Sequence, residues 1–344
     1  MKAKCPTDIF GSPLTSDNVT TYYKSIVKIT HPDHYNGNRK LVYVAEEATK
    51  ILNSYYKEAK DTIEGKTPPS NTSFKNVVYD TYFKTGDCEY WLSNKFIDDN
   101  FCRVYMGERK SPTGNEDICL KISKDPEDNY LLINESEILK KISHKSMPIL
   151  VDTFVTNDGN EANVIRKVNE SYDLIKIKEM YPDGVSQEHV VWMMDRLLSV
   201  MGYLHINNVI HGGIEPGNIL ITPYNHNATL IDYIFAIDEA NKPGMKYSGV
   251  NEFSAPEISK GSKPHPATDM YSLGKVMEYI ITDNNGEFKN DVDSRLKNFI
   301  SGFTQKNPSE RASDAWEYWY KLRSLREEIF GARNQFLPFN IKKI

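Results

Sequence analysis

"VIHGGIEPGNIL", residues 209–220, is the stretch that decides how the rest of the chain is interpreted. It has the frame of a phosphate-transfer loop, with His211 near one end, Asn218 near the other and Pro216 between them. Glycine, as Gly213, occupies the position at which such a loop carries its acid. The surrounding sequence must therefore decide whether the chain keeps the chemistry or only the shape.

Strand patterns precede this loop, and a long helical pattern leads into it. "CRVYMGERKSPTGNEDICLKIS", residues 102–123, predicts two strands around a turn, and "LLINESEILKKIS", residues 131–143, predicts a helix. Residues 186–208 form a longer helical pattern with an apolar side at Val190 or Val191, Met194, Leu197 or Leu198, Met201 and Leu204. Strands followed by helices predict a two-lobed α+β domain.

In their order and intervals, these motifs resemble a protein kinase over about 240 residues. "DICLKI" places Lys121 where that family has the lysine that holds the α- and β-phosphates, and "NESEIL" places Glu135 at its helix partner. "LIDYIF" places Asp232 at the metal-binding position. The resemblance implies that Lys121, Glu135, Asn218 and Asp232 would form a nucleotide site, with Asn218 and Asp232 as the metal ligands.

Other matches to the kinase pattern are structural. "GVNEFSAPEI" places Glu257 at the end of an activation segment, and "NPSERAS" supplies Arg311 as its usual partner. "TDMYSLG" gives the buried Asp269, and the loop retains His211. The resemblance implies that these four residues maintain the fold.

The phosphate-handling positions depart from the family pattern. "FIDDNFCRV", residues 96–104, has no glycine where the family has a glycine-rich turn, and its Asp98 and Asp99 would repel ATP. His211-Gly212-Gly213 replaces H-R-D, which removes the aspartate that accepts the proton of the substrate hydroxyl. Glu215 replaces the following lysine and has the wrong charge for a transferring phosphoryl group.

The metal-binding segment departs as well, because Asp232-Tyr233-Ile234 puts a β-branched residue where glycine lets the backbone swing. From these losses we expect a pseudokinase that is not an enzyme and requires neither ATP nor Mg²⁺. The alternative is an unorthodox ATP-dependent kinase or nucleotidyl transferase that uses Lys121 and Asp232, with Glu215 as a displaced base.

Two helical patterns flank a polar loop in the first 65 residues. "LTSDNVTTYYKSIVKIT", residues 14–30, predicts a helix capped by Ser16 or Asp17, and "VAEEATKILNSYYKEAKDTI", residues 44–63, predicts a second. The two apolar stripes can pack together as an antiparallel hairpin. Pro32 in the intervening loop ends the first of these helices.

This arrangement resembles the J-domain of DnaJ-type co-chaperones. The resemblance assigns chaperone binding to Lys24, Lys28, His31, Pro32 and Asp33. It implies that the chain recruits a DnaK-type chaperone and stimulates its ATPase, while the kinase-like domain holds an unknown protein client. The other alternative is a pure interaction module that sequesters a chaperone or another cellular protein.

Composition and linker signals set the predicted domain limits. Pro68-Pro69 lies in a polar stretch that predicts a linker. We expect an all-α J-domain at 1–65, a linker at 66–84, a kinase-like domain with a β-rich first lobe and a helical second lobe at 85–325, and a C-terminal tail at 326–344.

Charge and cysteine content exclude several classes of protein. The net charge of -5 and the lack of a basic face argue against nucleic acid and anionic membranes as partners. The four cysteines show no C-x-x-C spacing, so neither a zinc site nor a disulfide framework is expected. No apolar run is long enough to span a bilayer, and we expect a cytoplasmic protein.

Overall fold

The chain divides into two units, Met1–Val78 and Tyr79–Ile344, each with its own hydrophobic core. The computed structural model describes residues 9–10, 15–30, 79–240, 250–331, 339 and 341, with single positions and short runs between 45 and 63. The boundary between the units falls inside the predicted linker at 66–84.

Helix α2, Ser16–Thr30, is the longest described element of the first unit. The apolar spacing predicts a helix here, and the structure confirms it. Its cap lies one residue earlier than expected, because Oγ1 of Thr15, rather than Ser16 or Asp17, accepts the N–H of Asn18 at 3.3 Å.

Helix α2 packs against helical positions between residues 45 and 63. The buried core of the unit consists of Phe10, Val19, Leu52 and Ala59. The ring of Tyr23 stacks on Tyr56 with centroids 3.9 Å apart, and its hydroxyl donates to Asn53 at 2.8 Å. These contacts bring two helical segments together, but they do not assign the unit to the J-domain family.

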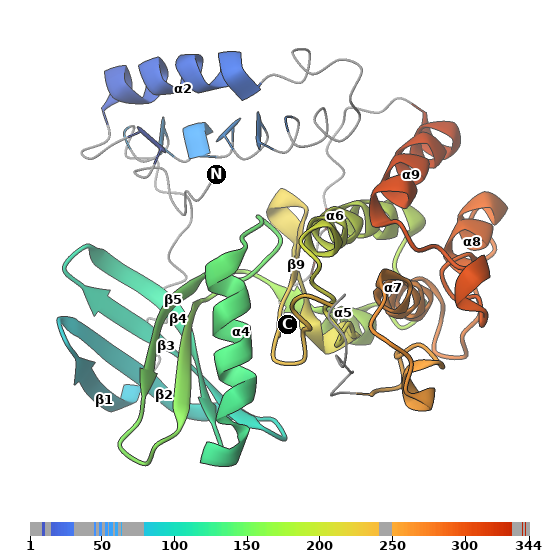
Figure 1. Cartoon of the computed structure of the whole chain (residues 1–344). Coiled ribbons are helices and arrows are strands. Elements are labelled where there is room, and N and C mark those ends of the chain that lie inside the picture. Colours follow the sequence, from blue (N-terminus) through green and yellow to red (C-terminus); the bar gives the residue numbers. More distant parts are fainter. Residues whose placement is uncertain are drawn as a thin grey trace. The chain divides into compact units, whose positions relative to one another are not determined.

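A six-stranded antiparallel sheet forms the first lobe of the second unit, in the order β1-β2-β3-β4-β6-β5 (Figure 1). The strands are β1 Tyr79–Thr85, β2 Cys88–Asp98, β3 Cys102–Ser111, β4 Gly114–Ser123, β5 Leu150–Val155 and β6 Glu161–Arg166. Tyr90, Leu92, Ile118, Leu120 and Val164 are buried in its core. The strand pair predicted over residues 102–123 is confirmed as β3 and β4.

Strand β1 lies partly in residues that the composition assigns to the linker. The ring of Phe83 in β1 stacks on that of Tyr90 in β2, with centroids 4.8 Å apart and an angle of 7° between the planes. The ring centroids of Tyr82 and Trp91 lie 4.6 Å apart. Cross-strand aromatic pairs of this kind stabilise a sheet by about 0.2–1 kcal/mol each. Residues 79–84 therefore belong to the sheet, because their aromatic side chains find partners on β2.

Helix α4, Asn129–Lys141, follows β4 across the 3-10 turn Pro126–Asp128 and confirms the helix predicted over 131–143. It packs against the sheet through β4, β5 and β6 (Figure 1). Its buried face includes Leu131, Leu132 and Ile138 together with the charged Glu135. A carboxylate on the buried face of a helix needs a partner, and it finds one on β4.

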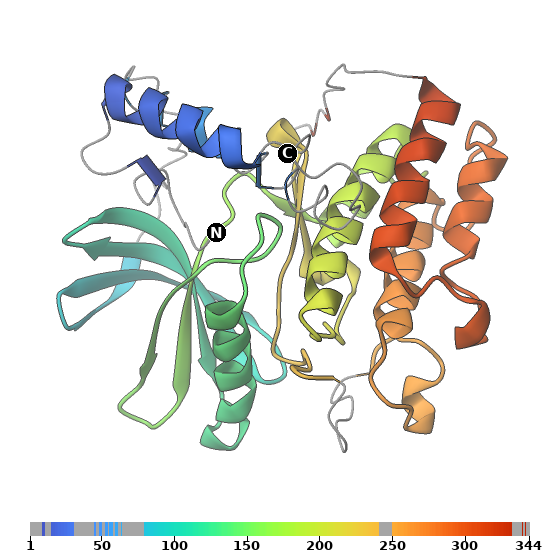
Figure 2. The ribbon, with the colours of Figure 1, turned by 45° about the horizontal axis from the view of Figure 1, so that its top comes forward.

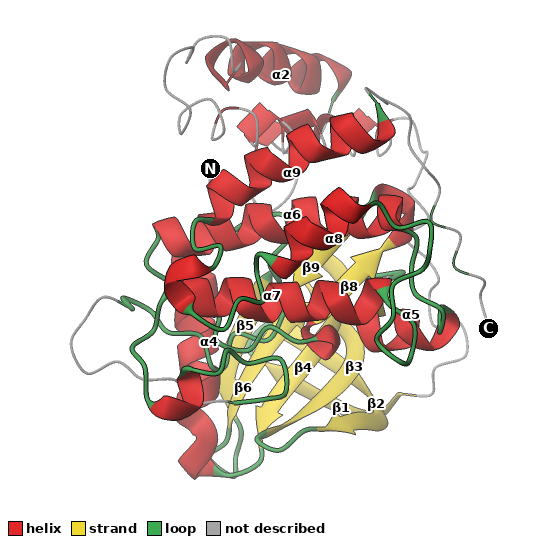
Figure 3. Cartoon of the chain, turned by 90° about the vertical axis from the view of Figure 1, so that its right-hand side faces the viewer, coloured by secondary structure: helices red, strands yellow, loops and turns green. Residues whose placement is uncertain are grey.

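The second lobe is helical, with a small three-stranded sheet at its edge. Its helices are α5 Leu174–Met180, α6 Gln187–Ile206, α7 Pro266–Ile281, α8 Ser294–Ser301 and α9 Ala315–Phe330, and its strands are β7 Tyr172–Asp173, β8 Ile219–Thr222 and β9 Asn227–Leu230. Helix α6 packs against both α7 and α9, and the three lie side by side in Figure 2. Figure 1 shows the sheet on one side and these helices on the other, and in Figure 3 the helical lobe lies in front of the strands; this confirms the predicted two-lobed α+β fold for this unit.

Helix α6 is buried on nearly every side. The predicted apolar positions are buried, but so are Met193, Val200 and Gly202, which the predicted stripe does not include. A Cβ built on Gly202 would lie 2.5 Å from the ring of Trp316 on α9. The two helices approach this closely only because position 202 has no side chain.

Phe339 packs against the second lobe. Only 5% of Phe339 is exposed, and its ring lies 4.4 Å from His189 and 5.6 Å from Tyr181 between centroids. Trp192 completes the pocket by stacking on His226 and donating from Nε1 to Nδ1 of His189 at 3.0 Å. Burial lowers the pKa of His189 to about 4, so this nitrogen is free to accept the hydrogen bond at neutral pH.

Replacing Phe339 by alanine is expected to lower the free energy of unfolding of the second unit by about 2 kcal/mol, since a buried phenylalanine contributes about 1.5–3 kcal/mol. All four tryptophans lie in this unit, so their fluorescence during urea titration measures its unfolding alone. Tyr224→Ala, at an exposed ring on the turn before His226, is the control. Equal stability of the two variants would contradict a stabilising role for Phe339.

No helix in the described part of the chain combines the length and apolar character needed to cross a membrane.

Candidate active site

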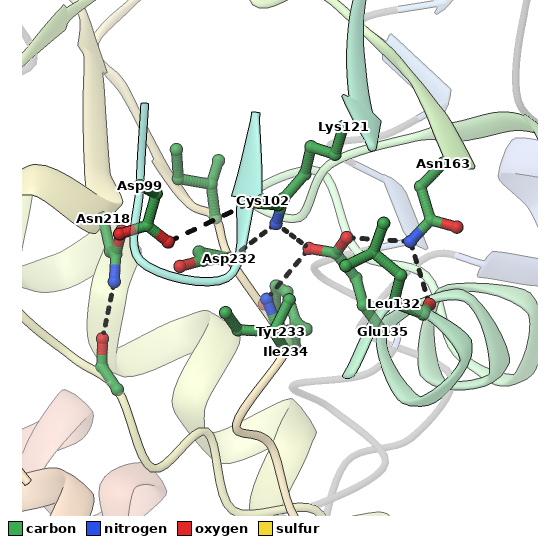
Figure 4. Close-up of polar contacts among 12 residues, drawn as sticks. Asp99, Cys102, Lys121, Leu132, Glu135, Asn163, Asn218, Asp232, Tyr233 and Ile234 are labelled. Atoms are coloured by element: carbon green, nitrogen blue, oxygen red, sulfur yellow. Dashed lines mark hydrogen bonds and ion pairs between the residues drawn. The ribbon is translucent and has the colours of Figure 1, made fainter. Parts of the chain in front are cut away.

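Lys121 joins the two lobes of the second unit through two ion pairs. It lies on β4, and its Nζ donates to Oε1 of Glu135 at 2.8 Å and to Oδ1 of Asp232 at 2.6 Å (Figure 4). Only 7% of Lys121 and none of Glu135 is exposed. The structure therefore brings Asp232 to Lys121, 111 positions earlier in the chain, and both to the site of Glu135.

The charge of Lys121 is fixed by its two carboxylate partners. Burial alone would lower the pKa of its ammonium group, but attraction by Asp232 and Glu135 outweighs burial and raises the pKa. Lys121 therefore stays positive at any physiological pH, as a group that binds phosphate must.

Asn163 and Tyr233 hold Glu135 in position. Nδ2 of Asn163 donates to Oε2 of Glu135 at 2.9 Å, and the backbone N–H of Tyr233 donates to Oε1 at 3.2 Å (Figure 4). Asn163 is not among the residues that the sequence motifs predict for this site. The sequence does contain an indication of its role, since Asn163 is the one amide side chain in "EANVIR", residues 161–166. A buried polar side chain in an apolar strand needs a hydrogen-bond partner.

The loop over residues 209–220 is fastened to Asp269. The two oxygens of this carboxylate accept the backbone N–H groups of His211 at 2.9 Å and Gly212 at 3.0 Å, and Nε2 of His205 lies 3.0 Å from Oδ2. Burial would raise the pKa of Asp269, but hydrogen bonding and the charge of His205 outweigh it, so the pKa is lowered. Asp269 therefore remains ionised and holds the backbone of the loop through these hydrogen bonds.

His211 supports the loop from within as a neutral ring. Burial lowers its pKa, against the attraction of Asp269. Nδ1 accepts the N–H of Gly213 at 3.3 Å, so Nε2 carries the proton and donates to the carbonyl of Ile231 at 3.2 Å. This residue keeps the structural place that the motif predicts.

Gly213 leaves open space where the kinase pattern has its aspartate. A Cβ built there would have His211 and Phe235 as its nearest neighbours at 3.9 Å, an ordinary contact distance. The carbonyl of Gly213 accepts the side-chain amide of Asn218 at 2.9 Å (Figure 4). The backbone frame of the loop is therefore complete although its acid is missing.

The turn before β3 differs from its predicted role. Oδ1 of Asp98 lies 2.8 Å from Nζ of Lys124 and 3.8 Å from Nε of Arg103, so this carboxylate is compensated by two cations. The turn is closed by the N–H of Asp99, which donates to the carbonyl of Cys102 at 3.0 Å. Of the two acids expected to repel ATP, Asp98 is therefore paired with cations.

The segment from Asp232 to Ala236 is fastened in place. Asp232 has a φ of 69°, and Nδ2 of Asn134 on α4 donates to the carbonyls of Ile234 at 3.2 Å and Ala236 at 2.8 Å. Tyr233 is fully buried, and its ring meets that of His211 with centroids 4.7 Å apart. These contacts hold the segment in its observed position, and its reduced ability to switch remains a prediction from the sequence.

Arg311 and Glu257 form the predicted structural pair. Nη1 and Nη2 of Arg311 lie 2.6 Å and 3.1 Å from the two carboxylate oxygens of Glu257. The same guanidinium group donates to the carbonyls of Ala267 and Gln305, and its side chain is fully buried. A buried, bidentate pair with every donor engaged fixes the end of the activation segment to the helical lobe.

Glu215 is half-buried in the same loop as Gly213. Its Oε2 accepts a hydrogen bond from Nδ2 of Asn251, near the end of the activation segment, at 2.7 Å. Burial raises the pKa of Glu215, and the charges of Asp232 and Asp99 raise it further, against this hydrogen bond. The sequence suggested Glu215 as a displaced base, but Asn251 as its partner was not predicted.

The residues fit a magnesium nucleotide. Oδ2 of Asp232 and Oδ1 of Asn218 have no hydrogen-bond partner among the described residues, and they are oxygen donors of the type that Mg²⁺ prefers. Magnesium is usually held by one or two protein groups together with substrate phosphates. This agrees with the finding that the described residues contain no closed group of three metal-binding side chains.

The residues assigned to chaperone binding are not brought together by the described structure. Lys24 and Lys28 are exposed on α2, four positions apart. His31, Pro32 and Asp33 lie outside the described residues. Their role remains a prediction from the sequence.

Comparison with known proteins now identifies the family. Residues 100–322 match the protein kinase domain, which is more than half of the chain. The chain therefore belongs to the protein kinase family, and a kinase domain uses ATP and Mg²⁺. The matched region begins at the turn between β2 and β3 and ends within α9.

Curated relatives from distant organisms carry kinase names. The chain is 26% identical to the serine/threonine-protein kinase TIO of Arabidopsis thaliana over 65% of its own length and 18% of that protein. It is 25% identical to the calcium/calmodulin-dependent protein kinase type 1 of Caenorhabditis elegans, over 64% of this chain and 62% of the relative. The chain thus spans less than two thirds of the length of these relatives.

These comparisons correct two predictions. The chain is not assigned to the J-domain co-chaperones, and the prediction that it is a non-enzymatic pseudokinase serving as a scaffold is wrong, since both the matched domain and the named relatives are kinases. The expectation that ATP and Mg²⁺ are not required is corrected with it. The missing side chain at Gly213 suggests an inactive protein, whereas Lys121, Glu135 and Asp232 are retained and meet in the structure.

Proposed function

We propose that this chain is an ATP-dependent protein kinase that transfers a phosphoryl group to a serine or threonine hydroxyl of a protein. The observation that carries the proposal is the buried Lys121, paired with both Glu135 and Asp232 across the two lobes. Membership of the protein kinase family supports the same reaction class.

The retained residues would bind different parts of magnesium ATP. Lys121 places a permanent positive charge where the motif puts the α- and β-phosphates, and Glu135 keeps its Nζ in place. Asp232 and Asn218 would hold Mg²⁺ through their uncommitted oxygens. When bound, magnesium ATP supplies the phosphoryl group and the charge neutralisation that its transfer needs.

The missing side chain at Gly213 bears on the rate. A positioned general base contributes about 10² to 10⁴ to a rate. Positioning and electrostatic stabilisation supply most of the catalysis of phosphoryl transfer, and these depend on Lys121, Asn218 and Asp232. We therefore propose a slow kinase that retains the phosphate-binding lysine and the metal-binding residues.

Asp232→Asn is expected to lower transfer of label from γ-labelled ATP to protein at least about tenfold, because the amide removes one charge from the metal site while still accepting from Lys121. The full chain is incubated with magnesium ATP and a mixed pool of serine and threonine peptides. Asp238→Asn, which changes a carboxylate paired with the exposed Lys141, is the matched control.

Two outcomes would contradict the proposed kinase. One is an unmodified chain that transfers no γ-label, and the other is transfer that Asp232→Asn leaves unchanged. A parallel reaction with α-labelled ATP detects nucleotidyl transfer, and label from the α-phosphate alone would replace the proposal by that reaction.

A further inference from the structure

Glu215 carries the only carboxylate of the loop at residues 209–220. It lies two residues after Gly213, and its carbonyl accepts the N–H of Asn218 at 3.0 Å. The Asn218 side chain in turn holds the carbonyl of Gly213. The backbone at Glu215 is therefore tied to the same frame as the position that lacks an acid.

Asn251 orients the Glu215 carboxylate. The Oδ1 atom of Asn251 is used within its own turn, where it accepts the N–H of Phe253 at 2.9 Å and the hydroxyl of Ser254 at 3.1 Å. Its Nδ2 is left to donate to Oε2 of Glu215 at 2.7 Å. The Asn251 amide cannot rotate by 180° without losing these bonds, so its Nδ2 holds Oε2 of the Glu215 carboxylate in place.

The second oxygen of Glu215 remains available. No described residue donates a hydrogen bond to Oε1, which lies 3.8 Å from the position of a Cβ built on Gly217. A Cβ built on Gly217 would also lie 3.5 Å from Cδ1 of Ile175, an ordinary contact distance, so position 217 places no side chain over Oε1. A half-buried carboxylate with one oxygen fixed and the other uncommitted is suited to accept one further hydrogen bond.

We propose that Oε1 of Glu215 accepts the hydrogen bond of the substrate hydroxyl and that Asn251 is its positioning residue. The inference rests on the proposed kinase activity. In the transfer step, the hydroxyl oxygen forms a bond to the γ-phosphorus, and the bond from this phosphorus to the bridging oxygen breaks. The electron pair of that bond leaves with ADP, and the hydroxyl proton passes to Oε1 of Glu215.

Glu215→Gln tests the proposal with a nearly isosteric side chain. The oxygen of the new amide must accept from Asn251, so its NH₂ group faces the substrate, where an acceptor is required. We expect kcat for γ-label transfer to the peptide pool to fall at least tenfold, with KM for ATP changed less than twofold. Glu252→Gln, at the exposed carboxylate next to Asn251, is the matched control and should keep the wild-type kcat.

Asn251 supplies a second test that does not alter the carboxylate. Asn251→Ala frees Glu215 to change rotamer and should lower kcat by about threefold to tenfold, whereas Asn251→Gln, which keeps the donor, should recover part of the loss. Thermal melting of each variant checks that the fold persists.

The outcomes separate this inference from the proposed function. An unmodified chain that transfers no γ-label overturns the proposed kinase and this inference together. Transfer that is abolished by Asp232→Asn but keeps its wild-type kcat in Glu215→Gln overturns the role of Glu215 alone.

Discussion

Replacing Gly213 by aspartate is expected to raise kcat for phosphoryl transfer about 10²-fold or more, because a correctly placed general base contributes about 10² to 10⁴. The site can receive the new side chain. A Cβ at this position has no neighbour closer than 3.9 Å, and the φ of Gly213 lies outside the left-handed region that disfavours side chains. The measurement is steady-state transfer of γ-label to the peptide pool.

Gly213→Asn is the matched control, because it adds almost the same volume without a base. A similar rate for Gly213→Asp and Gly213→Asn would contradict the expected result. Gly212 offers no equivalent test, because its φ of 72° strains any side chain placed there.

The new aspartate should also make kcat less dependent on Glu215. If both carboxylates serve the same hydroxyl, Glu215→Gln costs much less in the Gly213→Asp background than in the unmodified chain. Such a double-mutant cycle measures the coupling between the two positions. If Glu215→Gln lowers kcat by the same factor in both backgrounds, the two carboxylates act on different steps.

Arg311→Met is expected to lower the free energy of unfolding of the second unit by about 3–5 kcal/mol, the usual cost of removing one partner from a buried ion pair. The loss leaves Glu257 without its cation and the carbonyls of Ala267 and Gln305 without a donor. Urea unfolding followed by tryptophan fluorescence is the measurement.

Arg295→Met is the control, since Arg295 is 48% exposed in its pair with Asp293 and such surface pairs contribute about 0–1 kcal/mol. Equal losses in the two variants would contradict the structural role of Arg311. Replacing Glu257 by leucine in the Arg311→Met background should recover part of the stability, because it removes the unpaired buried charge.

Much of the second unit could be predicted because its signals are local or are fixed by motif order. The strands β3 and β4 and the helices α4 and α6 follow from hydrophobic spacing. The meeting of Lys121, Glu135 and Asp232 follows from their places in an ordered set of motifs, each of which is weak alone. Strand β1 was missed, because an edge strand such as residues 79–85 is defined by its pairing with β2.

The asparagines that position the site through hydrogen bonds were harder to predict than its charged residues. Asn163, Asn134 and Asn251 each act through a partner far away in the sequence, and an asparagine taken alone suggests a turn or a cap as readily as a buried bond. The assignment of function failed for a related reason. Missing side chains were counted from the sequence, whereas the open space at Gly213 could be seen only in the fold.

The anchored segment from Asp232 to Ala236 has a consequence for inhibitor design. A compound that requires this segment to leave its place would have to break the bonds from Asn134 and expose the buried Tyr233 and Ile234. Exposing two such side chains costs about 3–6 kcal/mol, which lowers the affinity by more than a hundredfold. Selective compounds for this site should therefore contact Lys121 and leave the segment where it is.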